Sequence, residues 1–81
     1  MKKKDKEAEV KRLVALVGAN IRAYRKDANM TQEKLSELAE VNEKHLSAIE
    51  NGREGNLSIG YIVSIALALG VSFSDLVKEG Q

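Results

Sequence analysis

The chain has 81 residues, a net charge of +1 and an apolar fraction of 43%, which suits one small globular domain with little room for a second core. It contains no cysteine, which excludes a disulfide framework and a thiolate zinc site and is compatible with a reducing compartment. No apolar run is long enough to span a membrane, and charged residues follow the basic start where a signal peptide would be apolar. We therefore expect a cytoplasmic protein.

The charge is unevenly distributed along the chain. Residues 1–30 contain nine Lys and Arg against four Asp and Glu, a balance of +5, whereas residues 31–81 contain four against eight, a balance of −4. Such asymmetry suggests a charged partner surface. Residues 1–6 are expected to form a disordered basic tail before a domain over residues 7–81. For the lysines of the tail we favour solvation over a DNA-binding arm: Lys2, Lys3, Lys4 and Lys6.

The first helix is predicted over residues 7–26. Gly18 lies inside it and weakens it slightly. Residues 27–30 are an exit loop, and Met30 is expected to enter the core. The apolar residues of the helix recur at helical intervals: Val10, Leu13, Val14, Val17, Ile21 and Tyr24.

Residues 31–52 are predicted to form two short helices joined by a tight turn. Thr31 and Asn42 are suitable N-caps, because their side-chain oxygens can accept free backbone N–H groups. Only Glu40 and Val41 separate the first helix from the second cap, so the two helices must cross steeply, as in a helix-turn-helix unit. The apolar residues again follow helical spacing, with a stop at Asn51-Gly52: Leu35, Leu38 and Ala39, then Leu46 and Ile49.

Two further helices complete the predicted fold. Ser58 caps an almost wholly apolar helix over residues 59–69, which Gly70 ends. Ser72 and Asp75 resemble a capping box before a short last helix. The sequence has no strand pattern and no repeat, so we predict an all-α fold of five helices. The apolar residues of the last helix are Phe73, Leu76 and Val77.

Positions spread over roughly residues 18–77 together form a family pattern. They are Ile21-Arg22, Arg25, Thr31-Gln32, Leu35, Ala39, Val41, Leu46-Ser47, Ile49-Glu50-Asn51-Gly52, Leu57-Ser58, Ile65-Ala66, Ala68-Leu69-Gly70-Val71 and Leu76. In these residues the chain resembles the lambda-repressor-like, Cro/C1-type (XRE) helix-turn-helix transcriptional regulators. That resemblance implies a regulator that binds double-stranded DNA, at a pseudo-palindromic operator, as a homodimer. One residue departs from the pattern: the family usually has glycine at the turn position of Glu40, which is strained by about 1 kcal/mol if φ must be positive there.

The second helix of the unit is expected to read DNA bases in the major groove, with its first turn and the face beyond it. Lys44 can donate to guanine, Glu43 can accept from cytosine, and Ala48 offers a methyl contact to thymine. The resemblance assigns base contacts to these three positions, and Ser47 lies within reach. For Glu43 a purely structural role near the positive end of the helix dipole is equally open.

Phosphate contacts are expected near the helix ends. Gln32 follows the cap of the first short helix, where free backbone amides form a natural phosphate site. The resemblance implies that Gln32 also braces the reading helix. It further pairs Arg25 with Glu50, which the guanidinium fork suits and which would hold the reading helix to the first helix. The other candidates for backbone contacts are Arg22, Asn42, His45, Asn51 and Arg53.

A homodimer is expected to form through the last two helices, because their apolar residues exceed what a core needs. The residues expected to face the core in the fourth helix are Ile59, Ile62, Ile65, Ala66 and Leu69. The remaining apolar residues, which we assign to the dimer interface, are Tyr61, Val63, Leu67, Ala68, Phe73 and Val77. The alternative is that a small bundle buries this helix on most sides.

An enzyme is not expected, because the only histidine is His45 on the reading helix and no glycine-rich phosphate loop or metal-ligand cluster occurs. We expect no cofactor, no metal and no small-molecule ligand. A protein-interaction module, such as an antitoxin, remains an alternative. Among regulators, residues 53–77 favour the controller proteins of restriction-modification systems, although phage repressors share most of the pattern.

Overall fold

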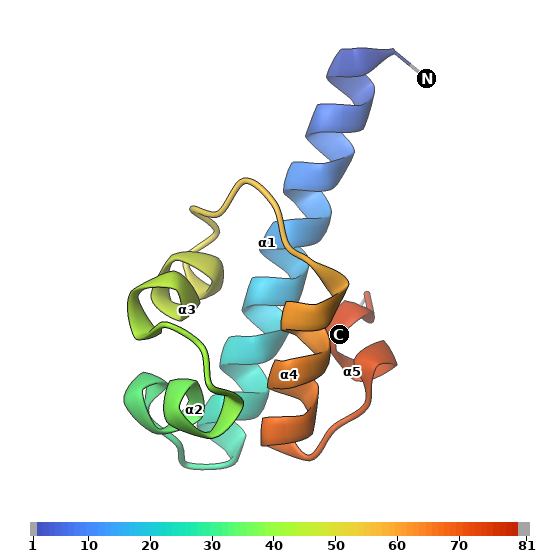
Figure 1. Ribbon diagram of the computed structural model, residues 1–81. Helices are drawn as coiled ribbons and strands as arrows, with labels where there is room; N and C mark the ends of the chain where they lie inside the picture. The colour runs from blue at the N-terminus through green and yellow to red at the C-terminus, as the bar shows by residue number, and fades with distance from the viewer. Residues whose placement is uncertain (1, 80–81) are drawn as a thin grey trace.

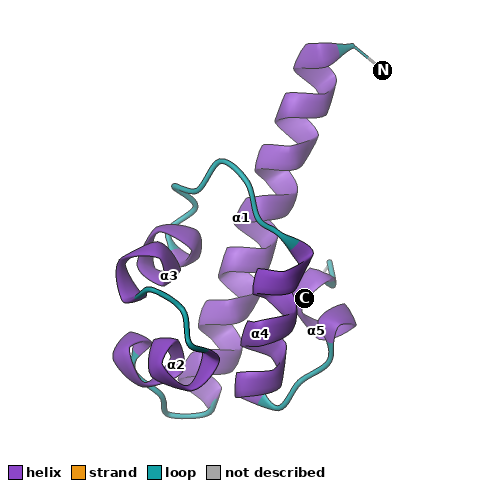
Figure 2. Ribbon diagram, in the orientation of Figure 1, coloured by secondary structure: helices purple, strands orange, loops and turns teal. Residues whose placement is uncertain are grey.

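A computed structural model describes residues 2–79 as helices joined by short loops, and no strand occurs in that range (Figure 2). The predicted all-α fold is confirmed. α1 is the long axis of the molecule; α2 and α3 lie on one side of it and α5 on the other, while α4 lies in front of α1 and packs against α2 and α5 (Figure 1). The five helices are α1 (Lys3–Asp27), α2 (Gln32–Ala39), α3 (Glu43–Glu50), α4 (Ile59–Leu69) and α5 (Phe73–Val77).

α1 begins earlier than the sequence pattern indicated. The helix starts at Lys3, so residues 3–6 are helical where a disordered tail was expected. Lys, Glu and Ala are good helix formers, and Asp5 in the first turn complements the helix dipole. These first turns project beyond the bundle (Figure 1), and residues 2–9 are exposed. Met1 and residues 80–81, which the expected tail and domain included, lie outside the described residues.

One apolar core joins all five helices. Six of its side chains are almost completely inaccessible to solvent, and each contributes about 1.5–3 kcal/mol relative to exposure. α3 places two residues in this core, so the packing of the core sets where the outer face of α3 points. The core residues are Val17, Ile21, Leu35, Leu46, Ile49, Ile62, Ile65, Ala66 and Leu76.

The turn between α2 and α3 forces a non-glycine residue into the left-handed region. Glu40 has φ 57° and ψ 46°, and the N–H of Val41 donates to the carbonyl of Ser36 at 2.9 Å. The turn therefore has the left-handed geometry that the family usually gives to glycine. A glutamate costs about 1 kcal/mol there.

We expect Glu40→Gly to raise the free energy of unfolding by about 0.5–1 kcal/mol, because glycine adopts positive φ without steric strain. Urea denaturation followed by circular dichroism measures the change. Asn29→Gly is the matched control: Asn29 also has φ 57°, but asparagine tolerates this region better, so its gain should be smaller. An unchanged or lowered midpoint for Glu40→Gly would contradict the strain.

The stripe of α4 that faces the core is shifted from the predicted one. Ile59 was expected in the core, yet it is 69% exposed. A spacing of four residues places Ile59 on the same helix stripe as Val63 and Leu67, and that stripe points away from the core. The prediction that Tyr61, Ala68 and Val77 are surplus to the core is also wrong. These three side chains are partly buried and pack against the core.

α5 is held to α1 by a buried amide. The Nδ2 of Asn20 donates to the carbonyls of Leu76 and Lys78, both at 2.9 Å. Carbonyls at a helix C-terminus have no partner within the helix, so Asn20 satisfies two acceptors that would otherwise compete for water. At the other end of α5, the predicted capping box between Ser72 and Asp75 is present.

Candidate nucleic-acid interface

α3, the helix expected to read DNA, begins at a well-formed cap. The Oδ1 of Asn42 accepts the N–H of His45 at 3.0 Å, and the Oγ1 of Thr31 accepts the N–H of Lys34 at 3.0 Å at the start of α2. Both predicted caps are therefore present. α3 lies at the outer edge of the molecule beside α2 (Figure 1), so its outward face is free of covering elements among the described residues.

The two sides of α3 differ in character. Leu46 and Ile49 are completely buried, and a helix turns by about 100° per residue, so Lys44 and Ala48 lie on the opposite side. Lys44 is exposed and Ala48 is half-buried. The two other residues that we assigned to base contacts are also accessible at this surface: Glu43 is exposed and Ser47 is half-buried.

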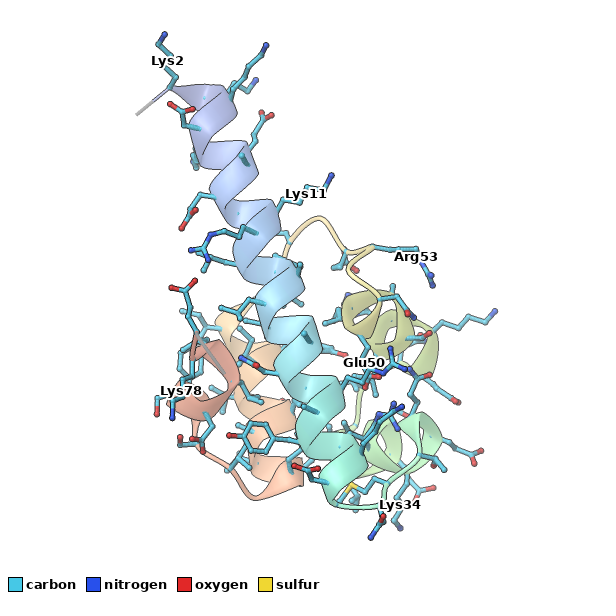
Figure 3. All side chains as sticks on the ribbon, turned by 180° about the vertical axis from the view of Figure 1, so that it is seen from behind. Lys2, Lys11, Lys34, Glu50, Arg53 and Lys78 are labelled. Atoms are coloured by element: carbon cyan, nitrogen blue, oxygen red, sulfur yellow. The ribbon has the colours of Figure 1, made fainter. Side chains whose placement is uncertain are left out.

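A buried ion pair ties the end of α3 to α1. Arg25 donates from Nε and Nη2 to the two carboxylate oxygens of Glu50 at 2.8 and 2.9 Å. The side chains are 10% and 1% exposed, and hydrogen bonding to Glu50 raises the pKa of Arg25. The remaining Nη1 of Arg25 donates to the carbonyl of Met30 at 2.8 Å. Glu50 lies where α1 passes α3 (Figure 3).

Gln32 joins this pair, as its expected bracing role requires. Its Nε2 donates to Oε1 of Glu50 at 3.0 Å, which links the first turn of α2 to the last turn of α3. This bond uses one N–H of the Gln32 side-chain amide, and the second N–H of Nε2 can still donate to a phosphate. The free first-turn backbone amides of α2 offer further donors at the same place.

The close approach of α1 and α3 depends on Gly18. A Cβ on residue 18 would lie 2.0 Å from the carbonyl oxygen of Ile49 and 2.9 Å from its carbonyl carbon. Both atoms are backbone and cannot rotate away. From helix propensity, Gly18 was expected only to weaken the helix. An isolated glycine among good helix formers also indicates close packing, and that signal was present in the sequence.

His45 does not share the outward face of α3. Its Nε2 lies 2.7 Å from a carboxylate oxygen of Glu54, and its ring contacts that of Tyr61 with centroids 5.0 Å apart. Burial raises the pKa of Tyr61 to about 12. His45 was expected to contact the DNA backbone, but the structure places its side chain toward the α3–α4 loop and α4 instead. The interaction with Glu54 holds that loop against α3.

The other expected backbone contacts lie on α1, at the two ends of α3 and on the loop that follows it. Arg22, Asn42, Asn51 and Arg53 are all exposed. Nδ2 of Asn51 donates to the carbonyl of Ser47 at 2.8 Å, so Asn51 closes the C-terminus of α3. Arg53 follows two residues later on the α3–α4 loop. Asn42 and Asn51 thus lie at the two ends of α3, and Arg53 lies just beyond its C-terminal end.

In this helix-turn-helix, buried side chains and the Arg25–Glu50 pair hold the inner side of α3, and its outer side is exposed. Such an arrangement defines a DNA-binding domain of the lambda-repressor-like type. A family model described as "Helix-turn-helix" matches residues 21–76. The chain therefore belongs to the helix-turn-helix family, of the Cro/C1 or XRE type. This is a family of DNA-binding transcription regulators rather than enzymes.

Regulators of bacterial origin support the same assignment. The chain is 33% identical to the HTH-type transcriptional regulator SinR of Bacillus licheniformis over 64 residues, which are 79% of this chain and 58% of SinR. The chain thus spans little more than half of that relative. The N-terminal DNA-binding domain of SinR from Bacillus subtilis superimposes with a TM-score of 0.77 and 31% identity, over 83% of this chain and 97% of that domain.

A controller protein is also similar. The restriction-modification controller protein C.AhdI from Aeromonas hydrophila superimposes with a TM-score of 0.73 and 25% identity, over 78% of this chain and 94% of that protein.

Within residues 2–79, none of the helices combines the length and the apolar character needed to cross a membrane.

Proposed function

We propose that this chain is a sequence-specific transcriptional regulator that binds double-stranded DNA in the cytoplasm. The observation that carries the proposal is the seating of α3. Two buried apolar residues and the Arg25–Glu50 pair hold one side of the helix, while Lys44 and Ala48 face outward. A helix held in this way can enter a major groove without rearranging.

The roles of individual residues follow from their positions. Glu43, Lys44, Ser47 and Ala48 read base edges, and Lys44 donates to guanine. Phosphates on the two sides of the groove are contacted by exposed or edge residues and by the first-turn amides of α2. These backbone contacts are made by Arg22, Gln32, Asn42, Asn51 and Arg53.

Lys44→Ala is expected to weaken binding to the specific operator by about 1–3 kcal/mol and to leave the fold intact. The operator is first obtained by selection from random duplexes with the wild-type protein. Lys26→Ala, at an exposed position on α1, is the control and should bind as the wild type does. An isotherm of Lys44→Ala that coincides with that of the wild type would reject a base-reading role.

We further propose that the regulator is a homodimer formed through α4 and α5. An exposed apolar stripe supports this: Ile59, Val63 and Leu67 are 69%, 39% and 78% exposed, and Phe73 at the start of α5 is 38% exposed. A monomer usually presents polar residues at such positions. Two reading helices related by a two-fold axis would bind half-sites about 34 Å apart.

Leu67→Glu is expected to produce a folded monomer that binds the operator much more weakly, because a charge would be desolvated in the dimer contact. Sedimentation at micromolar concentration measures the oligomeric state, and circular dichroism checks the fold. Ala23→Glu, at an exposed position on α1, introduces the same charge elsewhere and should remain dimeric. The dimer proposal fails if the wild type is monomeric both alone and on operator DNA.

Among regulators, we favour a controller of a restriction-modification system. The similarity to C.AhdI over nearly the whole length of that protein supports this choice. Neighbouring genes for a restriction endonuclease or methyltransferase, with an operator in front of them that this protein binds, would test it. A protein-interaction module is the second candidate, because the apolar stripe on α4 could bind another protein; such a module would lack salt-dependent binding to DNA.

A further inference from the structure

A groove of about 660 Å³ lies between the projecting start of α1 and the α3–α4 loop. We refer to it as the basic groove, because lysine and arginine side chains from both elements line it. On α1 these residues belong to the turns that project beyond the bundle. The lining residues are Lys3, Lys6, Glu7, Val10, Lys11, Gly52, Arg53, Glu54 and Gly55.

The charge of the basic groove is predominantly positive. Lys3, Lys6, Lys11 and Arg53 form no ion pair within residues 2–79. The lining also contains two carboxylates, Glu7 and Glu54, so four cations against two carboxylates leave a balance of +2. Four cations without an internal partner around one hollow indicate an anionic ligand with several charges.

Of the acidic residues near the start of α1, Glu7 lies in the groove lining and forms no ion pair within residues 2–79. On another face of the helix, Glu9 pairs with Arg12 at 2.7 Å, and Arg12 also pairs with Glu79 beyond α5. One face of α1, toward α5, therefore pairs its own charges, whereas the face toward the α3–α4 loop carries three lysines against one glutamate. The difference between the two faces appears only when the helix is formed.

The basic groove continues from the face proposed to contact DNA. Gly52 and Arg53 follow closely on α3, and Arg53 is itself a proposed phosphate contact. Lys11 and Arg53 project toward the side of the molecule on which α3 lies (Figure 3). The α1 residues of the groove precede residues 21–76, which the family model matches, so the shared helix-turn-helix fold does not account for them.

We propose that the basic groove binds phosphates of the DNA that flanks the half-site read by α3. This inference rests on the proposed operator binding. Lys3 and Lys11 are eight residues apart, about 12 Å along the helix at 1.5 Å per residue. One strand of duplex DNA places a phosphate every 3.4 Å along its axis, so the lysines can follow about three or four phosphates. The lysines at positions 3 and 6 then bind DNA, where the sequence alone favoured solvation.

The test compares two lengths of DNA and three proteins. One duplex carries the selected operator alone, and the other adds about ten base pairs of unrelated sequence on each side. The proteins are the wild type, the groove variant Lys6→Gln/Lys11→Gln and the control variant Lys26→Gln/Lys78→Gln. Lysine and glutamine have similar helix propensities, and the control residues are exposed and do not line the groove.

The wild type and the control variant should bind the flanked duplex more tightly than the short one, and the groove variant should lose that preference. Removing one lysine–phosphate interaction reduces the steepness of log affinity against log salt by about 0.9. Raising the salt from about 50 to about 200 mM weakens binding of both proteins to the flanked duplex. Because the groove variant lacks two lysines, its loss of affinity should be about ten times smaller per half-site than the loss of the wild type.

Failure of this inference can be told apart from failure of the proposed function. If the wild type binds the short operator but gains nothing from flanking DNA, the basic groove has no role in DNA binding, and operator recognition stands. The inference is also overturned if the groove variant keeps the gain or if the control variant loses it equally. If the wild type selects no sequence at all, the proposed function fails and this inference fails with it.

Discussion

Arg25→Ala is expected to lower the free energy of unfolding by about 3–5 kcal/mol, because it leaves the carboxylate of Glu50 buried without its cation. The Glu50 side chain is only 1% exposed, and Gln32 would be its one remaining side-chain donor among the described residues. Glu50→Ala should cost less, since Arg25 is less buried and keeps its hydrogen bond to the carbonyl of Met30. A domain of this size has a stability of only about 4–12 kcal/mol, so the first variant approaches the limit of folding.

The measurement is a double-mutant cycle in urea with Arg25→Ala, Glu50→Ala and the combined variant. The combined loss should be smaller than the sum of the single losses, because removing both partners leaves no unpaired charge. Arg25→Lys and Glu50→Gln serve where an alanine variant does not fold. The exposed pair Lys34–Glu37, 3.6 Å apart, is the matched control and should couple by less than about 0.5 kcal/mol. If the losses in the free energy of unfolding at Arg25 and Glu50 are strictly additive, the pair does not hold α3 to α1.

Gly18→Ala is expected to destabilise the fold by about 3 kcal/mol and to weaken operator binding as well. Alanine raises helix propensity by up to about 1 kcal/mol over glycine, but the added Cβ would lie 2.0 Å from the Ile49 carbonyl oxygen. Relief requires α1 and α3 to move apart, and Ile49 belongs to α3, the helix that we propose to read DNA. The substitution should therefore move the outward face of α3 relative to α2.

Gly60→Ala is the control for Gly18→Ala. Gly60 is also helical, but a Cβ there would meet only a hydroxyl at 4.0 Å, so the substitution should stabilise by up to about 1 kcal/mol. Thermal or urea unfolding of the two variants gives opposite signs if the clash is decisive. A stabilised Gly18→Ala variant that still binds the operator would show that the α1–α3 contact is looser than its geometry indicates.

Much of the fold could be predicted because its determinants are local. Thr31, Asn42, Ser58 and Ser72 each cap the helix that the sequence assigned to them, since a cap needs only backbone amides two or three residues away. The residue that departs from the family pattern at the α2–α3 turn is likewise visible in the sequence, because the family usually has glycine at that position. The Arg25–Glu50 pair lies 25 positions apart in the chain, and only the resemblance to a family brought it to attention.

The sequence by itself determined the helices, their caps and the helix-turn-helix, because periodicity and capping act within a few residues. Tertiary structure alone decided whether a side chain such as Ile59 faces the core or the solvent, and which group His45 contacts. Ile59 satisfies both the core spacing and the surface spacing, and only the packing of α4 against the bundle assigns it to the surface. His45 turns to Glu54 because the α3–α4 loop brings that carboxylate beside it. The basic groove likewise exists only because α1 continues past the loop that carries Arg53, an approach between distant segments that no local pattern encodes.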